Sequence, residues 1–276
     1  MELQYFILTH FNILLWRQDK EGRKVRTTKW LEHRFSLFEK YCLPSIKNQT
    51  CQNFEWIVLF DSMTPESFKD RIESYRKDCP QLIPVFVEPE NGFRFAEIFK
   101  NEIAKRLKAK RVILTYLNND DALNIGLVED LQQRALSVNG TFFYYDEGYQ
   151  YYTEDQFMMQ IRYPKNHFVS VVENASAARG IFCYGGHYYI DKIKGVRIVH
   201  VSDKPMWCEL VHEKNVLNDA NFILHTKMVR GENRLRREFA IDEIVRYGIG
   251  IYIRRFLPRY IKTFGRRAKR LFERKR

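Results

Sequence analysis

Four polar residues in a row, Asn118, Asn119, Asp120 and Asp121, follow a short apolar run near the middle of the chain. The run, 111–117, carries no charge after its first residue and is typical of a strand buried on both faces of a parallel sheet. Ligands of open α/β sheets bind beyond the carboxyl ends of such strands, and paired carboxylates are hard oxygen ligands that suit Mg²⁺ or Mn²⁺. The segment therefore predicts a divalent-cation site that holds a substrate diphosphate. The alternative is a helix cap, because Asn and Asp are also favoured at the N-cap.

Strands and helices alternate four times over the first 137 residues. The pattern predicts strands at 4–9, 55–60, 82–87 and 111–117, and helices at 28–41, at 65 onwards, at 94–107 and at 125–136. We expect Pro44 to stop the first helix, and Thr64 to be the N-cap residue of the second. This alternation predicts a mostly parallel sheet with crossover helices, which must position the polar loop at one edge.

After Gly140 the chain consists of short aromatic and β-branched runs broken by Gly, Asp, Pro and Asn. We expect mixed or antiparallel strands and loops, added to the parallel half, in TFFYY, YQYYT, FMMQIRY, HFVSVVE, IFCYGGHYYI and VRIVHV. Residues 239–247 are expected to be helical, and a long helix is expected from Ile249 onwards, kinked at Pro258 and Gly265.

Most of the formal charge of +12 belongs to the C-terminal segment. Residues 246–276 hold twelve Lys or Arg against Glu273 alone, a charge of +11, so residues 1–245 carry about +1. The five cysteines show no CxxC spacing, which favours free thiols in a reducing compartment. The apolar N-terminus makes a poor signal peptide, and no run reaches the ~18 apolar residues of a membrane span. We therefore expect a soluble or membrane-peripheral cytoplasmic protein.

The basic segment 246–276 has three interpretations. Its Arg and Lys alternate with Ile, Phe, Leu and Tyr, so it could lie on an anionic membrane, hold the phosphates of a nucleic acid, or be a solvated charge run. No nucleic-acid-binding module accompanies it, which makes nucleic acid the less favoured partner. We expect the inner face of a membrane.

Several of these segments in order resemble one family of proteins. FILTHFNI, then W-x3-R-x6-YCLPSIKNQT from Trp30, then FEWIVLFD and NNDDAL, resemble the rhamnosyltransferase family, a bacterial group of GT-A-type glycosyltransferases. The resemblance extends to about Asn215 through PMWCELVHEKN. It implies a nucleotide-sugar donor in the first half, an acceptor in the second and a DxD-like metal site. The family loop usually reads Asp-Asn-Asp-Asp, whereas this chain has Asn118, so the metal is assigned to Asp120 with Asp121 as helper or cap.

Donor-binding candidates lie at the ends of the predicted strands. His10 and Asn12 follow the first strand and Asp61 the second, and Asn118 and Asp121 complete the set with Arg17 of a basic loop. Arg17, Arg23, Lys24 and Arg26 could clamp a diphosphate, because Arg matches phosphate oxygens bidentately. The simpler alternatives are turn residues for the strand ends and a solvated loop for the basic run.

The resemblance and the residue types suggest the remaining roles. GT-A enzymes commonly supply a late histidine to the metal, for which we choose His212, with His187 as its competitor. Glu209 and Asp203 are candidates for the base that deprotonates the acceptor, since a general base needs one carboxylate within reach. Gly185 and Gly186 could let the backbone approach a ligand, or form an ordinary turn.

The sequence thus predicts one GT-A-like α/β domain over residues 1–245, with a donor half (1–137), an acceptor half (138–245) and a basic helical tail (246–276). We expect transfer of a hexose, with L-rhamnose as the candidate, from a nucleoside-diphosphate donor to a glycan or lipid-linked acceptor, with inversion and with Mn²⁺ or Mg²⁺. A nucleotidyltransferase is the alternative enzyme, although only Gly22 is available for a phosphate loop near the first strand. A non-catalytic protein docked on membrane or RNA is the third possibility.

Overall fold

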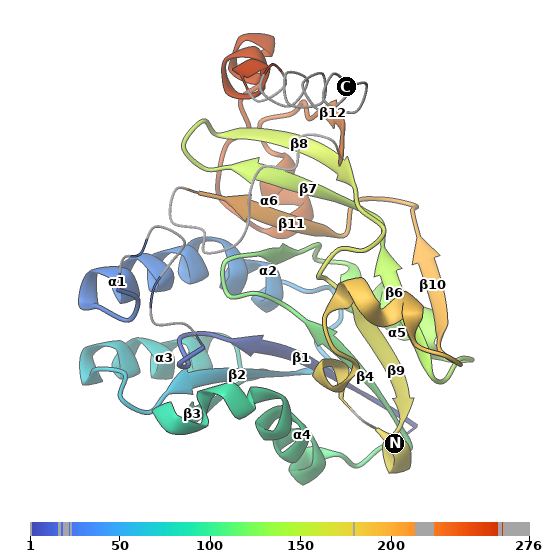
Figure 1. Cartoon of the computed structure of the whole chain (residues 1–276). Helices are drawn as coiled ribbons and strands as arrows, with labels where there is room; N and C mark the ends of the chain where they lie inside the picture. The colour runs from blue at the N-terminus through green and yellow to red at the C-terminus, as the bar shows by residue number, and fades with distance from the viewer. Residues whose placement is uncertain are drawn as a thin grey trace, which may run out of the picture.

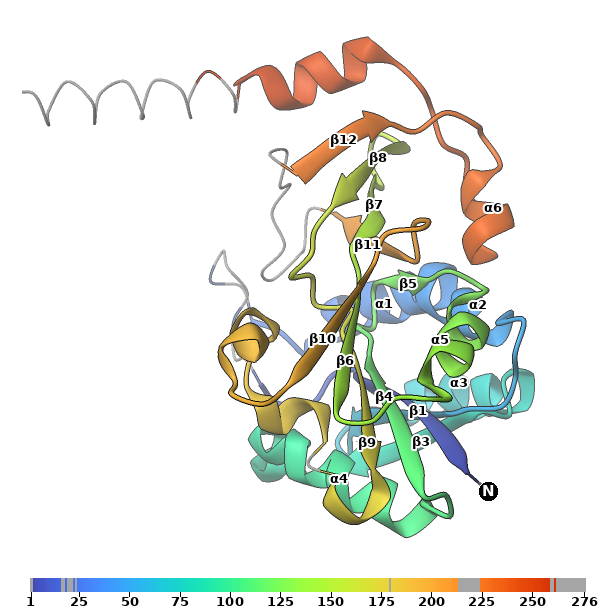
Figure 2. The same ribbon diagram turned by 90° about the vertical axis from the view of Figure 1, so that its right-hand side faces the viewer.

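The computed structural model describes residues 2–15, 18, 22, 24–178, 180–212, 224–258 and 261. The two sheets lie end to end, and helices cover both faces of the larger one (Figure 1). Seven strands form the larger sheet in the order β10-β6-β9-β4-β1-β2-β3, and five form the smaller in the order β12-β8-β7-β11-β5. Figure 2 shows the smaller sheet continuing upwards from the larger one.

The first half of the chain forms the parallel part of the larger sheet. Its strands are β1 (Leu3–His10), β2 (Glu55–Asp61), β3 (Leu82–Val87) and β4 (Arg111–Tyr116), and its helices are α1 (Thr28–Leu37), α2 (Leu43–Lys47), α3 (Glu66–Asp78), α4 (Phe95–Arg106) and α5 (Leu127–Ala135). β1 pairs in parallel with both β2 and β4. The prediction of a parallel sheet with crossover helices is confirmed.

Alternate residues of β1 face two separate cores, as expected for a strand buried on both faces. Tyr5 and Ile7 pack in the cluster that includes α1, α3 and α5, and Phe6 and Leu8 pack in the cluster that includes α4. Because both faces are covered, the parallel strands present their polar groups only at their ends. This leaves the carboxyl edge of the sheet as the place for chemistry.

Two local predictions about helix boundaries are wrong. Pro44 does not stop the first helix: α1 passes through the π-helical turn η1 (Phe38–Cys42) into α2, where Pro44 lies in the first turn and its missing N–H is not needed. Thr64 does not cap α3, because its hydroxyl donates to the carbonyl of Asp61 and accepts from Asn12.

The second half adds strands to both sheets. These are β6 (Thr141–Tyr145), β7 (Glu147–Tyr152), β8 (Phe157–Arg162), β9 (Ser170–Asn174), β10 (Arg197–Val201), β11 (Trp207–Val211) and β12 (His225–Met228). The pairing is mixed, since β10 runs parallel to β6 and β11 parallel to β7. The expected mixed and antiparallel additions are therefore present, and the mixed α/β class is confirmed.

IFCYGGHYYI is not a strand, contrary to the prediction. It forms the 3₁₀ turns η4 (Ile181–Tyr184) and η5 (His187–Lys192), because Gly180 and Gly185 have φ values of +86° and +80° that interrupt an extended chain. Gly185 thus serves an ordinary turn.

The helix predicted at 239–247 is also wrong. Helix α6 (Arg234–Phe239) ends where the expected helix begins, since Ala240 adopts the left-handed conformation. Residues 249–258 are helical as predicted, and the expected kink at Gly265 lies outside the described residues. None of the described helices is long and apolar enough to cross a bilayer.

A two-residue strand joins the polar loop to the smaller sheet. After β4 the chain turns at 118–121 and enters β5 (Ala122–Leu123), which pairs with Trp207 and Cys208 of β11. The same strand β11 also pairs with β7. Gly148 of β7 lies so close to the Trp207 ring that an added Cβ would be 2.2 Å from it, so this position requires glycine. The loop 118–121 therefore lies at the junction of the two sheets.

Candidate active site at the junction of the two sheets

Asp120 lies between groups from two distant parts of the chain. Its Oδ2 accepts a hydrogen bond from Nη1 of Arg34 on α1 at 2.8 Å, and Nε2 of His212, which follows β11, lies 3.2 Å from the same oxygen. Asp120 and His212 are both buried. The carboxylate is therefore not used to cap a helix, and the structure brings together Asp120 and His212, the two residues assigned to a metal from the sequence.

Asp121 ties the loop to the smaller sheet. Its Oδ1 accepts from the backbone N–H of Leu210 at 3.0 Å, and its Oδ2 lies 2.8 Å from Nδ2 of Asn118 and 2.9 Å from Nε2 of His167. Both carboxylate oxygens are engaged and the side chain is fully buried. This arrangement is that of a structural anchor beside Asp120.

The side-chain amide of Asn118 connects two neighbouring side chains. Asn118 donates to Asp121 and accepts through Oδ1 from the hydroxyl of Tyr116. Tyr116 also lies 3.0 Å from Nε2 of His10, so the ends of β4 and β1 are joined through one hydroxyl. A carboxylate at position 118 could not donate to Asp121.

The ends of β1 and β2 are joined in a similar way. The side-chain carbonyl of Asn12 accepts from the backbone N–H of Asp61 at 3.0 Å, and its amide donates to Thr64 at 2.9 Å. Asp61 pairs with Arg26 of the basic loop and accepts from the N–H of Met63. His10, Asn12 and Asp61 thus lie along one sheet edge, which Asn119 joins to the acidic loop by donating to the Phe11 carbonyl at 2.6 Å.

Glu209 points from β11 into the same junction. It is 9% exposed and accepts a hydrogen bond on Oε2 from Nε2 of Gln150 at 2.6 Å. Burial raises its pKa to about 7, the charge of His167 opposes that rise, and the charge of Asp121 adds to it. A carboxylate with a pKa near neutrality can exchange a proton under physiological conditions.

The other charges in the junction are strongly perturbed. Burial disfavours ionisation of Asp120, but the charge of Arg34 and the hydrogen bond from His212 outweigh it and hold its pKa well below the usual range. Burial, aided by Arg34, lowers the pKa of His10 to about 4, so this ring is neutral at pH 7. Burial opposes protonation of His167 as well, yet its contact with Asp121 raises the pKa of His167 overall.

Some predicted site residues lie elsewhere. The carboxylate of Asp203, 71% exposed, forms an ion pair with Arg134 of α5, so the structure does not bring it to Asp120. His187 lies against His167, with a ring separation of 6.1 Å, and contacts the carbonyl of Lys165 instead of Asp120. Arg17 and Arg23 lie outside the described residues.

Two ionisable partners of the loop, Arg34 and His167, are not among the predicted site residues. Arg34 was noted only within a motif, although it lies on the apolar stripe of α1 with Leu31 and Phe35, where a charge requires a partner. His167 precedes β9 and carries no comparable signal, because only the fold brings it to Asp121.

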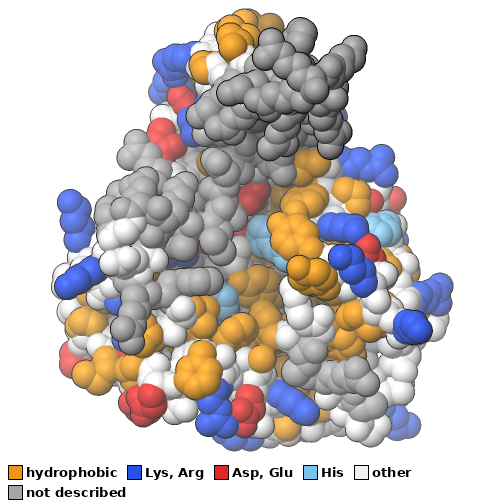
Figure 3. Space-filling view, viewed as in Figure 1, with side chains coloured by type: hydrophobic (Ala, Val, Ile, Leu, Met, Phe, Trp, Pro, Cys, Tyr) orange, Lys and Arg blue, Asp and Glu red, His pale blue; other side chains and the backbone are white. Residues whose placement is uncertain are grey.

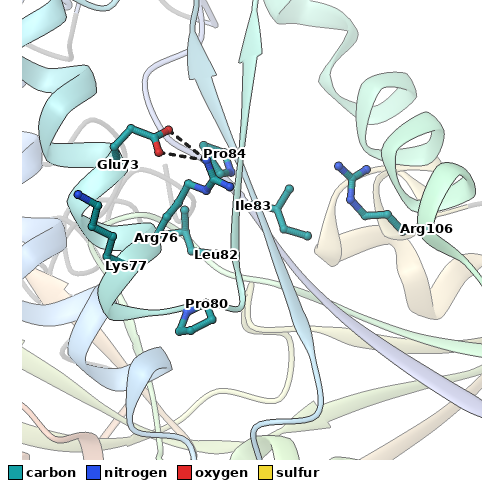
Figure 4. Close-up of a pocket in the computed structure, with 8 residues that line it drawn as sticks. All are labelled: Glu73, Arg76, Lys77, Pro80, Leu82, Ile83, Pro84 and Arg106. Carbon is teal, nitrogen blue, oxygen red and sulfur yellow. Dashed lines mark hydrogen bonds and ion pairs between the residues drawn. The ribbon is translucent and has the colours of Figure 1, made fainter.

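A surface hollow elsewhere does not coincide with this chemistry. It measures about 680 Å³ and lies at the edge strand β3, between α3 and α4, with Glu73 and Arg76 paired at its rim (Figure 4). On the face shown in Figure 3, histidine side chains lie near the centre, next to hydrophobic side chains. The junction, not the hollow at β3, holds the perturbed groups.

Asp120 and His212 fit a divalent cation as two ligands. The described residues contain no group of three or more His, Cys, Asp or Glu placed to hold a metal, so the protein would supply few ligands there. Mg²⁺ is commonly held in this way, by one or two carboxylates with substrate phosphates and water. Arg34 and His212 both contact Oδ2 of Asp120, so a cation held there would share this carboxylate with Arg34.

The parallel sheet, the acidic loop at its carboxyl edge and the added mixed sheet define a GT-A-like glycosyltransferase fold. A sequence model of the family described as "Putative rhamnosyl transferase" matches residues 9–222. The chain belongs to this family. A search of curated protein sequences finds no match.

The chain also has remote similarity to several solved structures. TarS of S. aureus, residues 1–349, is 12% identical with a TM-score of 0.41, over 76% of this chain and 60% of that one. A complex of the same fragment with UDP is 12% identical with a TM-score of 0.38, over 76% and 61%. A nucleoside-diphosphate-sugar pyrophosphorylase of Vibrio cholerae is 12% identical with a TM-score of 0.36, over 72% and 92%. The chain spans 37% of the longer TarS structure.

Proposed function

We propose that this protein transfers a sugar from a nucleoside-diphosphate donor to a hydroxyl of a glycan or lipid-linked saccharide. The observation that carries the proposal is the meeting of Asp120 and His212, 92 positions apart, at the carboxyl edge of the parallel sheet. Ligands of open α/β sheets bind at this edge, and family membership supports glycosyl transfer. The family description makes L-rhamnose the first sugar to test, with inversion at its anomeric carbon.

In this proposal the donor lies along the ends of β1, β2 and β4. His10, Asn12 and Asp61 would contact its nucleoside, and Asn118 with Asp121 would hold the loop in place. A divalent cation, held by Asp120 and His212, would neutralise the charge of the leaving diphosphate. Arg26 of the basic loop is held at this edge by its pair with Asp61.

Glu209 is the proposed base for the acceptor. Its burial at the junction and its pKa of about 7 support this role, because a base works best with a pKa near the operating pH. Asp203, which was the other candidate, is exposed and paired with Arg134. We therefore place the acceptor on the β7–β11 side of the junction.

A thermal-shift screen tests the donor site. Nucleoside diphosphates and nucleotide sugars, including UDP and dTDP-rhamnose, are added with and without Mn²⁺. A ligand at about 100 times its Kd should add about 2.7 kcal/mol to the free energy of unfolding. Asp120→Asn should abolish the Mn²⁺-dependent part of the shift, and Asp70→Asn, at an exposed position of α3, should keep it. No stabilisation of the wild-type protein by any nucleotide would contradict the proposal.

We also propose that the C-terminal helix binds an anionic membrane. Ile249, Ile253, Leu257 and Ile261 recur every four residues and are 64%, 48%, 49% and 65% exposed. Residues 259–276 add nine Lys or Arg and one Glu. An exposed apolar stripe beside many cations matches the surface of an anionic bilayer, where a lipid-linked acceptor would be found.

A further inference from the structure

Gln150 makes the single hydrogen bond that the described residues offer to the Glu209 carboxylate. The two residues are register partners on the parallel strands β7 and β11, and Gln150 is 1% exposed. Its Nε2 donates to Oε2 of Glu209 at 2.6 Å. Oε1 of Glu209 receives no hydrogen bond from the described residues, which leaves it available to take a proton.

The amide of Gln150 is itself fixed in one orientation. Its Oε1 accepts from the hydroxyl of Tyr152 at 2.9 Å and lies 3.1 Å from Nε2 of His225. Burial lowers the pKa of His225 to about 4, so this ring is neutral and can donate from Nε2. The amide nitrogen faces Glu209, and Oε1 faces Tyr152 and His225, whose Nε2 also lies 3.0 Å from the Tyr152 hydroxyl.

We propose that Gln150, oriented by Tyr152 and His225, is the positioning residue for Glu209: it holds the carboxylate in place and favours its ionised form. The inference rests on the proposed role of Glu209 as the base. A hydrogen bond donated to a carboxylate stabilises its charged form, whereas burial destabilises it. Gln150 thus limits how far burial can raise the pKa of Glu209.

Other groups around Glu209 act on the same equilibrium. His167 favours the charged form, and Asp121 and Asp120 disfavour it. Tyr163 also lies within electrostatic range of Glu209. Among these neighbours Gln150 is the uncharged one that contacts the carboxylate directly, so it can be replaced without changing the net charge.

The C-terminal helix covers the two residues that orient Gln150. The ring of Phe256, fully buried, lies 4.8 Å from that of His225 and 5.4 Å from that of Tyr152. The guanidinium of Arg255 lies 4.5 Å from the centre of the Tyr152 ring. The helix that carries the exposed apolar stripe therefore also packs on the two residues that contact Gln150.

The test is a direct titration of Glu209 by carbon NMR in protein labelled at the glutamate side-chain carboxyl carbon. The Glu209 signal is assigned by its absence in Glu209→Gln. Gln150→Met keeps the side-chain volume and removes the donor, so the Glu209 pKa should rise by about one unit. At pH 7 the ionised fraction, and with it the rate of transfer, should then fall about fivefold and recover at higher pH.

Two further variants keep the test decisive. Tyr152→Phe removes one donor to the Gln150 amide while keeping the ring, and should raise the Glu209 pKa by a smaller amount. Gln160→Met is the matched control, because Gln160 lies in the same sheet and donates to Glu147 at 2.9 Å; the Glu209 pKa should not change.

An unchanged Glu209 pKa in folded Gln150→Met would overturn the inference. The titration needs no substrate, so this result is independent of the transfer assay. Full transfer activity in Glu209→Gln would instead reject the proposed base, which separates the two failures.

Discussion

Nη1 of Arg34 lies 2.8 Å from Oδ2 of Asp120, and the two side chains are 12% and 11% exposed. The pair joins α1 to the end of β4 across 86 positions of the chain. Arg34 also donates to Asn119, so one guanidinium holds two consecutive residues of the loop. The geometry of the proposed donor site therefore depends on a cation supplied by the protein itself.

Replacing Arg34 with Met should destabilise the fold by about 3 kcal/mol, because it leaves the Asp120 carboxylate buried beside fewer positive charges. The low pKa of Asp120 in the folded state stabilises the protein above the pKa of the unfolded state, and this contribution is lost as the pH falls through the folded-state value. The difference in the free energy of unfolding between wild type and variant should therefore be large at pH 7 and small in acid. Urea unfolding at several pH values measures it.

Arg76→Met is the control for that experiment. Arg76 pairs with Glu73 on the surface of α3, with both side chains 53% exposed, and its loss should change stability by less than about 0.5 kcal/mol. A similar loss of stability in both variants would show that the Arg34–Asp120 pair stabilises the protein no more than the exposed Arg76–Glu73 pair does.

Asn118→Asp should make stability strongly dependent on pH. A carboxylate there would face Asp121 across the present 2.8 Å contact. Repulsion between the two negative charges would raise the pKa of one of the two carboxyl groups, so that the pair would share a proton. A carboxyl group whose folded-state pKa is raised loses stability as the pH increases from the unfolded to the folded value. The melting temperature of the variant should fall relative to wild type between about pH 4 and pH 8, by an amount that Mn²⁺ reduces. If the melting temperatures of the variant and of wild type change with pH in the same way across this range, residue 118 does not face Asp121.

The pH dependence of transfer should follow Glu209. With its pKa at about 7, kcat/KM should rise about tenfold per pH unit below pH 7 and level off above it. Glu209→Gln should lower kcat by 10²-fold to 10⁴-fold and remove this limb of the profile. Asp203→Asn, at the exposed candidate, should leave the profile in place. Stopped-time assays of diphosphate release at several pH values distinguish these outcomes.

The exposed apolar stripe should determine membrane binding. Ile253→Glu with Leu257→Glu should abolish sedimentation with phosphatidylserine-containing vesicles, since each charge opposes insertion of the helix face. Met63→Glu is the control, as Met63 is 71% exposed but belongs to the loop after β2. Binding that survives the double change but disappears at high salt would assign the membrane contact to the basic residues alone.

Point variants are preferable to removal of the tail. A chain ending at Val245 would lose Phe256, which packs on Tyr152 and His225 behind Gln150. Truncation would therefore change the surroundings of Glu209 as well as the membrane contact. The boundary between residues 245 and 246 remains a prediction.

The sequence by itself determined the strands of the first half, the helices between them and the placement of Asn118–Asp121 after β4. These features follow from local patterns: continuous apolar runs, helical spacing of apolar residues and a cluster of turn formers. Local patterns failed where a single backbone conformation decided the outcome, as at Ala240, or where proline was tolerated in a first turn, as at Pro44.

The tertiary structure alone decided which side chains meet. Arg34 contacts Asp120, His167 contacts Asp121 and Gln150 contacts Glu209, and each pair is separated by 46 positions or more. Spacing along the chain carries no record of such contacts, because sheet order and register create them. For the same reason the sequence offered Asp203 and Glu209 as equal candidates, and the fold buried one and exposed the other.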